Sequence, residues 1–440
     1  MGKEKIYQDD WLYSCLKPIV DWCTWNGYRK TCIHGKENIP TDGSILLTPN
    51  HCNTLMDALV MLRAHNKQTV FGARADLFNK PFIAKLMFFV RILPMVRQRD
   101  GLRNVLKNKD TQETIVETLE NNIRFCMYPE GTHRAKHSLQ VLGKGAFRAA
   151  LAANEKFGSE KPIYIVPVGI EYGDYFRYRS TSLVNYGQPI NVTEFIKDLD
   201  LENEAQVMEA LRKELSTRMS ELITYFKFDE NYDEKWALTK MLAIRDRKRG
   251  YGDFGTDLYE DMLRNRQIAS DIEKAIEEHP EEMAELLAEV KAFEKNRKKA
   301  GISIYAFKKK SNPVLNAVGK GFAALVGLPY FLYSAVTNLP IWATSFFIRG
   351  KVRDKAFRNT VSFGVKLAMT LILTPTYAAL AFCLAPWWLA IILLLLWLQG
   401  YAYFHDYLEG CRRWFSDIEL LRTRKLWKSF KSITKKFKQN

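Results

Sequence analysis

The sequence is poor in cysteine and in acidic residues. Its seven cysteines are scattered and include no C-x-x-C pair, which argues against a disulfide framework or a zinc site and for a reducing compartment. Lys and Arg number 65 against 49 Asp and Glu, so the formal net charge is +16. This balance excludes an acidic solvating chain and favours an anionic partner, namely nucleic acid, a phosphorylated substrate or a membrane surface.

Targeting signals and repeats are also missing. The first ten residues, MGKEKIYQDD, carry acids where a secretory signal would have its apolar run, and Ile6 stands where N-myristoylation requires Ser or Thr. We therefore expect no secretory signal and no acylation at Gly2. No internal repeat and no low-complexity tract is present. No recognised nucleic-acid-binding module surrounds the basic residues, so we expect no nucleic-acid partner.

What the chain does contain is an alternation of short apolar runs and helical patterns between about residues 30 and 230. Aromatic residues make up 13% of the 440 residues, which excludes disorder as the main state. The runs predict buried strands at 44–48, 69–72, 123–128 and 163–168. Helical periodicity follows Asp110, Lys144 and Glu202. The pattern predicts an α/β fold of layered sheet and helices.

Two long apolar stretches lie in the last third of the chain. The first runs from about 313 to 348 and the second from about 361 to 404, each with a single Lys. Breakers interrupt the first at Gly327–Pro329 and Asn338–Pro340, and the second at Ala385–Pro386. Buried helices of a soluble domain are the alternative, but runs of this length favour a bilayer.

The charges that flank these stretches indicate the topology. Lys and Arg precede the first stretch, separate the two and follow the second. If basic flanks stay cytoplasmic, each stretch enters and leaves on that side. We therefore predict two membrane hairpins. The second is long enough for two spans, whereas the choice between a spanning and a re-entrant first stretch stays open.

These observations divide the chain into five parts. An N-terminal helix (1–30) either packs on the core or lies at the bilayer interface. An α/β domain (31–230) is followed by a charged helical linker region (231–310) and the two hairpins (311–404). The last part (405–440) is a basic amphipathic tail that either lies on anionic lipid or is a solvated helix.

Two motifs follow predicted strands and carry chemistry. In the first, His51 and Asp57 flank a turn after the strand at 44–48, and a His paired with a carboxylate is the usual general base. The pair meets only if His51 lies in the turn and Asp57 in the first helical turn. In the second, Tyr128–Arg134 follows the strand at 123–128. Here Gly131 allows close backbone approach to a ligand, and Thr132 and Arg134 are candidate phosphate ligands.

Two further segments complete the pattern. Arg97 and Arg99 alternate on a segment expected to be extended, either as phosphate ligands or as a solvated edge. Ile165–Val168 is apolar and is either the lining of an acyl site or an ordinary buried strand.

The four segments in this order resemble the glycerolipid acyltransferases, the family that acylates glycerol-3-phosphate or lysophosphatidic acid. The family pattern is N-H-x-x-x-x-D, an Arg-bearing block, F-P-E-G-T-R and an apolar V-P-V block. The resemblance covers about residues 30–195. The sequence departs from it by one extra residue between His51 and Asp57, by Tyr128 in place of Phe and by His133 inserted before Arg134. The extra residue resembles the fungal glycerol-3-phosphate acyltransferase branch and many bacterial relatives. The C-terminal hairpins resemble that branch rather than the small bacterial lysophosphatidate enzymes.

The resemblance implies roles for individual residues. His51 is the expected general base and Asp57 its orienting partner. The expected substrate-binding residues are Arg74, Arg97, Arg99, Glu130, Gly131, Thr132, Arg134 and Lys144. No metal and no cofactor is implied, and acyl-CoA or acyl carrier protein serves as co-substrate. Cys52 adjoins His51, but no covalent step is expected there.

The sequence thus predicts a membrane-bound O-acyltransferase of phospholipid biosynthesis with its catalytic domain on the cytoplasmic face. Lysophosphatidic acid is favoured as acceptor over glycerol-3-phosphate, and the product is phosphatidic acid. A non-catalytic lipid-surface protein on the same fold, and an enzyme that acylates another lysolipid or an ornithine-type lipid, are the alternatives.

Overall fold

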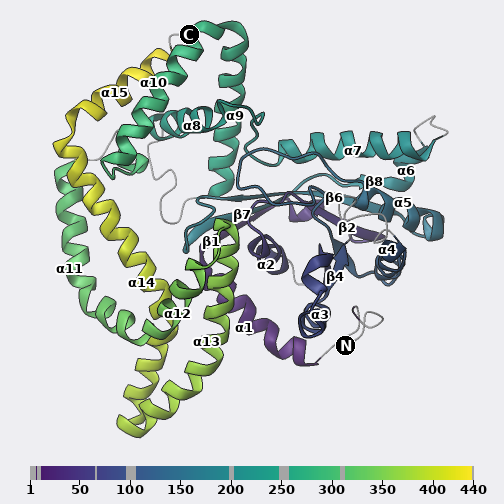
Figure 1. The fold of residues 1–440 in the computed structure, drawn as a ribbon, viewed down its shortest axis with the longest axis horizontal. Coiled ribbons are helices and arrows are strands. Elements are labelled where there is room, and N and C mark those ends of the chain that lie inside the picture. Colours follow the sequence, from purple (N-terminus) through teal and green to yellow (C-terminus); the bar gives the residue numbers. More distant parts are fainter. Residues whose placement is uncertain are drawn as a thin grey trace. The chain divides into compact units, whose positions relative to one another are not determined.

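The computed structural model describes residue 6 and residues 11–64, 67–95, 106–197, 203–246, 257–307 and 313–438, except for the side chains of 106–110, 246 and 313. The chain divides into two compact units. The first comprises residues Met1–Thr24, Thr31–Tyr175 and Ser182–Ile223, and the second comprises Trp25–Lys30, Phe176–Thr181 and Thr224–Asn440. Figure 1 shows the elements of both.

An eight-stranded sheet forms the centre of the first unit. Its strands are β1 (Tyr28–His34), β2 (Ser44–Pro49), β3 (Thr69–Arg74), β4 (Ile92–Met95), β5 (Arg124–Cys126), β6 (Ile163–Tyr172), β7 (Ser180–Tyr186) and β8 (Ile190–Asn191). Their order is β1-β7-β6-β2-β5-β3-β4, with β8 also paired to β6. β2 runs parallel to β5 and β6, and β3 parallel to β4 and β5, whereas β7 and β8 are antiparallel to β6. The carboxyl ends of β2 and β5 therefore meet at one edge of the sheet.

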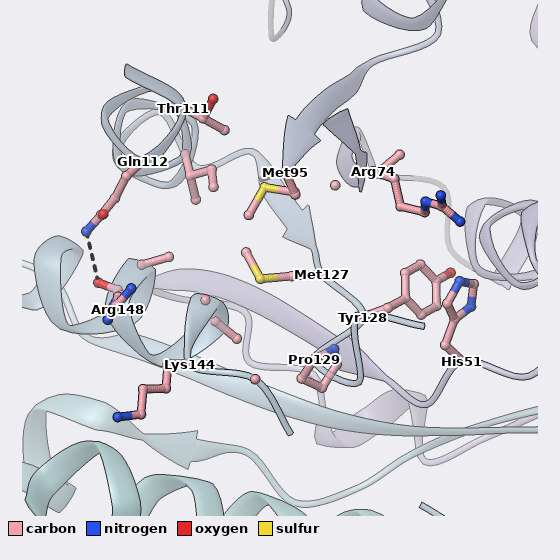
Figure 2. A pocket seen from close by; sticks show the side chains of 18 residues that line it. His51, Arg74, Met95, Thr111, Gln112, Met127, Tyr128, Pro129, Lys144 and Arg148 are labelled. Carbon is pink, nitrogen blue, oxygen red and sulfur yellow. Dashed lines mark hydrogen bonds between the residues drawn. The ribbon is translucent and has the colours of Figure 1, made fainter. Parts of the chain in front are cut away.

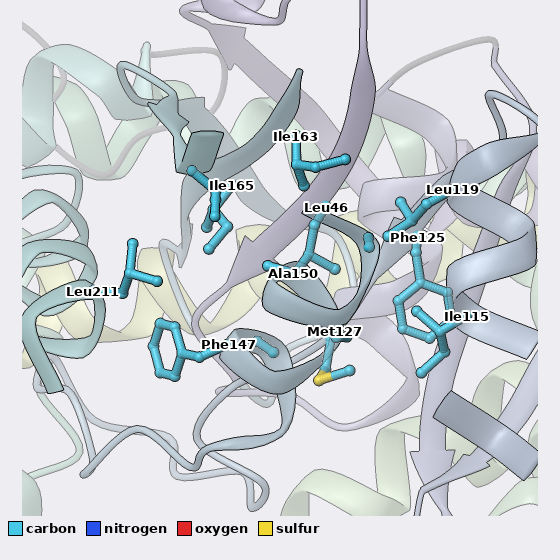
Figure 3. Close-up of a cluster of buried hydrophobic side chains, with 14 of the residues drawn as sticks. Leu46, Ile115, Leu119, Phe125, Met127, Phe147, Ala150, Ile163, Ile165 and Leu211 are labelled. Carbon is cyan, nitrogen blue, oxygen red and sulfur yellow. The ribbon is translucent and has the colours of Figure 1, made fainter. Parts of the chain in front are cut away.

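Helices cover both faces of the sheet. Those of this unit are α1 (Trp11–Gly27, whose last residues belong to the second unit), α2 (Leu55–Ala64), α3 (Pro81–Phe89), α4 (Leu106–Glu120), α5 (Gly145–Phe157), α6 (Val192–Lys197) and α7 (Glu204–Glu221), with the short 3₁₀ turns η2 (Lys36–Asn38) and η3 (Ala75–Phe78). α4, α5 and α7 share one core with alternate residues of the strands, such as Leu46, Phe125 and Ile165 (Figure 3). The intervening strand residues point to the other face, and Figure 1 draws α2 on the side opposite α7.

The α/β layer predicted from the sequence is confirmed. The predicted strand at 44–48 is β2, that at 69–72 is the start of β3, and that at 163–168 is the first part of β6. β5 is shorter than the predicted 123–128. The helix expected after Asp110 already begins at Leu106, and the one expected after Lys144 is α5.

The second unit is almost entirely helical. The region 231–310 holds α8 (Tyr232–Asp246), α9 (Leu258–Glu278), α10 (Pro280–Lys299) and the turn η6 (Ile304–Phe307). The basic tail forms α15 (Arg424–Lys436), and its apolar residues Leu426, Phe430 and Ile433 are buried in one core with α8, α10 and η6. The apolar face of the tail thus packs on protein, while its Lys residues are exposed.

The apolar stretches form α11 (Pro313–Thr337), α12 (Leu339–Gly350), α13 (Lys355–Leu384) and α14 (Trp387–Arg422). Three of these, 314–337, 355–384 and 387–422, are long and apolar enough to cross a membrane. The second break lies at Ala385–Pro386, as predicted. In the first stretch the chain turns at Asn338, whereas α11 continues through Pro329. α14 also continues without interruption through residue 405, where the basic tail was expected to begin.

Tyrosine hydroxyls connect α11 with α14. Those of Tyr330 and Tyr333 on α11 donate to the carbonyl oxygens of Leu396 and Leu393 at 2.7 Å each. In the reverse direction, Tyr403 and Tyr407 on α14 donate to carbonyl oxygens of α11. Because each hydroxyl finds its acceptor on the neighbouring helix, the two helices satisfy these polar groups without water.

Candidate active site

The His51 and Asp57 side chains are in contact. His51 lies in the turn after β2 and Asp57 in the first turn of α2, with 2.7 Å between His51 Nδ1 and Asp57 Oδ2. Asp57 is fully buried, whereas the His51 side chain is 19% exposed. With Nδ1 on the carboxylate, the other ring nitrogen, Nε2, is the one available for proton transfer to a substrate.

The turn between the two residues accommodates the extra residue of the motif. Thr54 has a φ of +49°, a left-handed conformation that a β-branched residue rarely adopts. It stands directly before α2, whose start is fixed by bonds from the Met56 and Asp57 amides to the Asn53 and Thr54 carbonyls. The left-handed residue reverses the chain within the turn, so that Asp57 faces His51 despite the longer spacing.

Neighbouring groups hold both ends of this turn. Asn50 bonds β6 through its side chain, which donates to the Ile170 carbonyl and accepts from the Ile170 amide at 2.6 Å. The Cys52 and Asn53 amides donate to Asp57 Oδ2 at 2.8 and 2.7 Å. A carboxylate that accepts several backbone bonds is stabilised in its ionised form.

Tyr172 completes the environment of Asp57. Its hydroxyl donates to Asp57 Oδ1 at 2.7 Å, and its side chain is buried. This contact exists because β6 runs four residues past Val168, which pairs with the last residue of β2. The sequence reasoning missed Tyr172, since neither its type nor its spacing from Val168 indicates how far β6 extends.

Residues of the second motif, Tyr128–Arg134, form hydrogen bonds with the backbone of His51 in the first motif. Glu130 accepts from the His51 amide at 2.9 Å through Oε1 and from the Gln140 amide at 3.1 Å through Oε2. Burial raises the pKa of the Glu130 carboxyl, and these donors oppose the shift. The Arg134 amide in turn donates to the His51 carbonyl at 2.9 Å. The segment from Glu130 to Arg134 therefore fixes the backbone on both sides of the His51 ring.

The other predicted residues of this motif bond within its own loop. Thr132 exchanges hydrogen bonds with the Gln140 side chain, and the Arg134 guanidinium donates to Ser138 Oγ and the Leu139 carbonyl. Gly131 has a φ of +65° and no atom within 4 Å of an added Cβ, so it is needed there for its backbone conformation.

A cavity of about 280 Å³ opens beside His51. Figure 2 shows the His51 and Tyr128 rings at one end, Met95 and Met127 along the middle, and Lys144 and Arg148 at the other end. The Tyr128 ring lies against His51, with 4.4 Å between the ring centres. Of the predicted site residues, His51, Arg74, Gly131 and Lys144 are among those that line the cavity, whereas Glu130, Thr132 and Arg134 are not. Arg97 and Arg99 lie outside the described residues.

The cavity carries positive charge. Lys144 and Gly145 stand at the N-terminus of α5, a 13-residue helix, where the helix dipole favours anions. Arg148, one turn further on, also lines the cavity. It was missed from the sequence, although its spacing from Lys144 places both residues on one side of a helix. Arg74 forms a bidentate bond with the exposed Asp76.

Cys52 is placed unfavourably for nucleophilic attack. It is buried, and this burial together with the nearby Asp57 charge raises the pKa of its thiol well above the ordinary value. Its Sγ lies 3.5 Å from Asp57 Oδ1. Since the thiolate is the nucleophile, a thiol kept protonated does not favour covalent catalysis at this position.

Comparisons with known proteins identify the region that holds these motifs. The Acyltransferase family model matches residues 30–171. A Caenorhabditis elegans protein, provisionally named as the 1-acyl-sn-glycerol-3-phosphate acyltransferase acl-2, is 25% identical over 170 residues. That match covers 38% of this chain and 55% of the relative, so the chain spans about half the length of the curated relative it matches.

A solved structure is also similar. It is the crystal structure of the 1-acyl-sn-glycerophosphate (LPA) acyltransferase PlsC from Thermotoga maritima, with a TM-score of 0.30 and 18% sequence identity. The match covers 46% of this chain and 79% of the bacterial chain. The matched family region contains β2, β5, most of β6 and the His51–Asp57 pair. Residues 30–171 of this chain are therefore similar to the Acyltransferase family, and the residues of the candidate active site lie within or next to this match.

Proposed function

We propose that this chain is a membrane-bound O-acyltransferase that transfers a fatty acyl group to the hydroxyl of lysophosphatidic acid, giving phosphatidic acid. Acyl-CoA or acyl carrier protein is the donor, and no cofactor takes part. The observation that carries the proposal is the 2.7 Å contact between His51 Nδ1 and Asp57 Oδ2 beside the cavity. The name of the C. elegans relative favours the same acceptor.

In the proposed reaction His51 is the general base. Its Nε2 takes the proton of the acceptor hydroxyl as the oxygen attacks the thioester carbonyl. The tetrahedral intermediate collapses with cleavage of the carbon–sulfur bond, and the leaving thiolate takes a proton from the imidazolium. The buried Asp57 carboxylate stabilises the imidazolium and fixes the tautomer, as in other His–carboxylate pairs.

The cationic cavity supports a phosphorylated acceptor. Lys144, Arg148 and the N-terminus of α5 offer donors and positive charge at the end away from His51. A phosphate held there leaves the glycerol part of the molecule directed toward the base. Arg74 is a further candidate if it exchanges Asp76 for phosphate, and Arg97 and Arg99 stay candidates from the sequence alone.

The three apolar helices support embedding in a bilayer, where a lysolipid acceptor resides. Basic residues flank the apolar stretches on each side, including Arg349, Lys351 and Arg353 between α12 and α13. By the positive-inside rule, the side of the membrane on which these basic residues lie is cytoplasmic. We therefore also propose that the acyltransferase domain lies on the cytoplasmic face.

A panel of acceptors tests the substrate assignment. Full-length protein in detergent receives radiolabelled acyl-CoA or acyl carrier protein together with lysophosphatidic acid, glycerol-3-phosphate, other lysophospholipids or an ornithine lipid. We expect phosphatidic acid to be the main product. Preferred acylation of another acceptor would replace the substrate, and transfer to none of them would favour a lipid-surface protein without catalysis.

A base variant tests the mechanism. His51→Ala is expected to lower turnover by about 10²–10⁴-fold, the usual contribution of a general base, in a protein that still folds. His279→Ala, at an exposed residue between α9 and α10, is the matched control and should keep full activity. A fully active His51→Ala protein would rule out this base.

A further inference from the structure

We infer that α11 and α12 form a re-entrant hairpin that enters and leaves one leaflet on the same side, while α13 and α14 cross the whole bilayer. The inference rests on the proposed membrane embedding and goes beyond it, because length and composition alone make α11 a candidate for a full crossing. The exposed apolar side chains of α11 and α12 then contact the acyl chains of the leaflet next to Arg349.

The length of α12 is the first argument. Its 12 residues rise about 18 Å, whereas the hydrocarbon core is about 30 Å thick. Arg349, Lys351 and Arg353 lie at and directly after its end. If α11 crossed completely, α12 would return only part of the way and leave these charges inside the membrane, where charged side chains are strongly unfavourable.

The register against α14 gives the depth of the turn. A Cβ added at Gly400 would lie 2.9 Å from Asn338 Nδ2, so the turn of the first hairpin packs at Gly400. Beyond the turn, Trp342 stacks near Phe404, with 6.4 Å between ring centres. The turn of the second hairpin, at Pro386, is fourteen residues from Gly400 along α14, which is about 21 Å on a helix. The first hairpin therefore stops well short of the second.

The turn at Asn338 is suited to an environment without water. Asn338 and Ser334 are 1% and 0% exposed. The Asn338 amide and side-chain nitrogens both donate to the Ser334 carbonyl, at 3.1 and 3.0 Å. From α13, the Tyr377 hydroxyl donates to the Thr337 carbonyl at 2.9 Å. Irregular backbone at membrane depth is tolerated only when protein satisfies its polar groups in this way.

The turn of the second hairpin has the opposite character. Leu384, Trp387 and Trp388 are 83%, 70% and 53% exposed. Tryptophans concentrate at the interface between membrane and water, which places this turn at the far surface. The exposed apolar side chains Leu332 and Val336, near the end of α11, instead fit contact with acyl chains.

Cysteine accessibility in sealed proteoliposomes tests the topology. The full chain with Cys15→Ser and Cys411→Ser keeps Cys383, which is exposed beside the second turn, as a native reporter. A membrane-impermeant maleimide should label Cys383 only from the side opposite Arg349. In the same background with Cys383→Ser, Leu339→Cys probes the first turn at a residue that is 46% exposed.

We expect Leu339→Cys to stay unlabelled from both sides. A small nitroxide attached there should collide with oxygen in the hydrocarbon and be protected from an aqueous nickel chelate. Labelling from the far side would mean a complete crossing, and labelling from the near side would mean a turn in water, so either result overturns the hairpin. Release of the protein by alkaline carbonate would instead refute the membrane embedding itself.

Discussion

The environment of Asp57 determines what His51 can do. The carboxylate is fully buried and accepts from His51 Nδ1, the Cys52 and Asn53 amides and the Tyr172 hydroxyl. The two amides share Oδ2 with His51, and Tyr172 binds Oδ1, so each of these three donors withdraws some of the negative charge that would otherwise stabilise the imidazolium. The support that Asp57 gives to an imidazolium at His51 therefore depends on these other donors to the carboxylate.

Removal of the Tyr172 hydroxyl should make this dependence measurable. Tyr172→Phe leaves Asp57 with one donor fewer, and a hydrogen bond to a charged group contributes about 1.5–3 kcal/mol. A less stabilised carboxylate favours the imidazolium more strongly. We expect the ascending limb of the kcat/KM profile to move to higher pH, so that activity measured on that limb falls by about tenfold.

The pH profile distinguishes a positioning role from a loss of packing. Tyr164→Phe, on the same strand but distant from Asp57, is the matched control and should leave the profile in place. An unshifted limb in Tyr172→Phe, even with reduced activity, would contradict the electrostatic role of Tyr172.

At the scale of elements, the turn from His51 to α2 determines whether the His51 and Asp57 side chains can meet. Its geometry depends on the left-handed Thr54, with a φ of +49°, and such strain is tolerated only where the surroundings impose it. Proline fixes φ near −65°. Thr54→Pro should therefore separate His51 from Asp57 and lower activity to about the level of His51→Ala, a loss of roughly 10²–10⁴-fold.

Two other variants at the same position make this prediction specific. Thr54→Gly adopts a positive φ without strain and should keep its activity, with Thr54→Ala in between. All three variants lack the threonine hydroxyl and differ in the backbone conformation that they permit, and proline also lacks the backbone N–H. If Thr54→Pro were as active as Thr54→Gly, the left-handed turn would not be what brings the pair together.

Several elements follow from local sequence pattern, and others do not. The run at 44–48 and the Gly-Lys-Gly turn before α5 predict their elements because apolar runs and glycines act locally. The extension of β6 to Tyr172 depends on its pairing with Ser182 on β7, which is ten residues further along the chain. The path of α11 through Pro329 depends on its packing with α14, and so a helix breaker did not end it.

Some features of the candidate site were also predictable from the sequence, and others were not. The order of motifs predicted that His51 and Asp57 belong together, although the spacing did not show how they meet. Lys144 was predicted to bind substrate and lines the cavity, whereas Arg148, which also lines it, was not predicted. Glu130 was expected to bind substrate, whereas its two oxygens bond the His51 and Gln140 amides. A local motif identifies residue types near a site, but only tertiary structure decides which of them face the cavity.

For the whole molecule, the second unit gathers segments that lie far apart in the sequence. Trp25–Lys30 and Phe176–Thr181 belong with Thr224–Asn440. Arg29 Nη2 lies 2.6 Å from Asp406 Oδ1, and Arg179 Nη2 lies 3.0 Å from Asp406 Oδ2. The neighbouring Arg177 pairs with Glu409 at 2.7 Å. Carboxylates on α14 thus hold two remote segments by charge, a pairing that sequence patterns do not indicate.

Loss of Asp406 should therefore destabilise this unit. Its side chain is 26% exposed, and those of Arg29 and Arg179 are 16% and 17% exposed, so Asp406→Asn leaves two largely buried guanidinium groups without their shared carboxylate. Breaking a buried pair costs about 3–5 kcal/mol, and partial exposure reduces this to roughly 2–3 kcal/mol. The loss in free energy of unfolding is measured by denaturation in detergent, with unfolding monitored by limited proteolysis at α14.

Glu419→Gln is the control on the same helix, because its partner Arg422 is 74% exposed and such pairs contribute at most about 1 kcal/mol. Equal stability losses in the two variants would mean that the network around Asp406 contributes no more than a solvent-exposed ion pair.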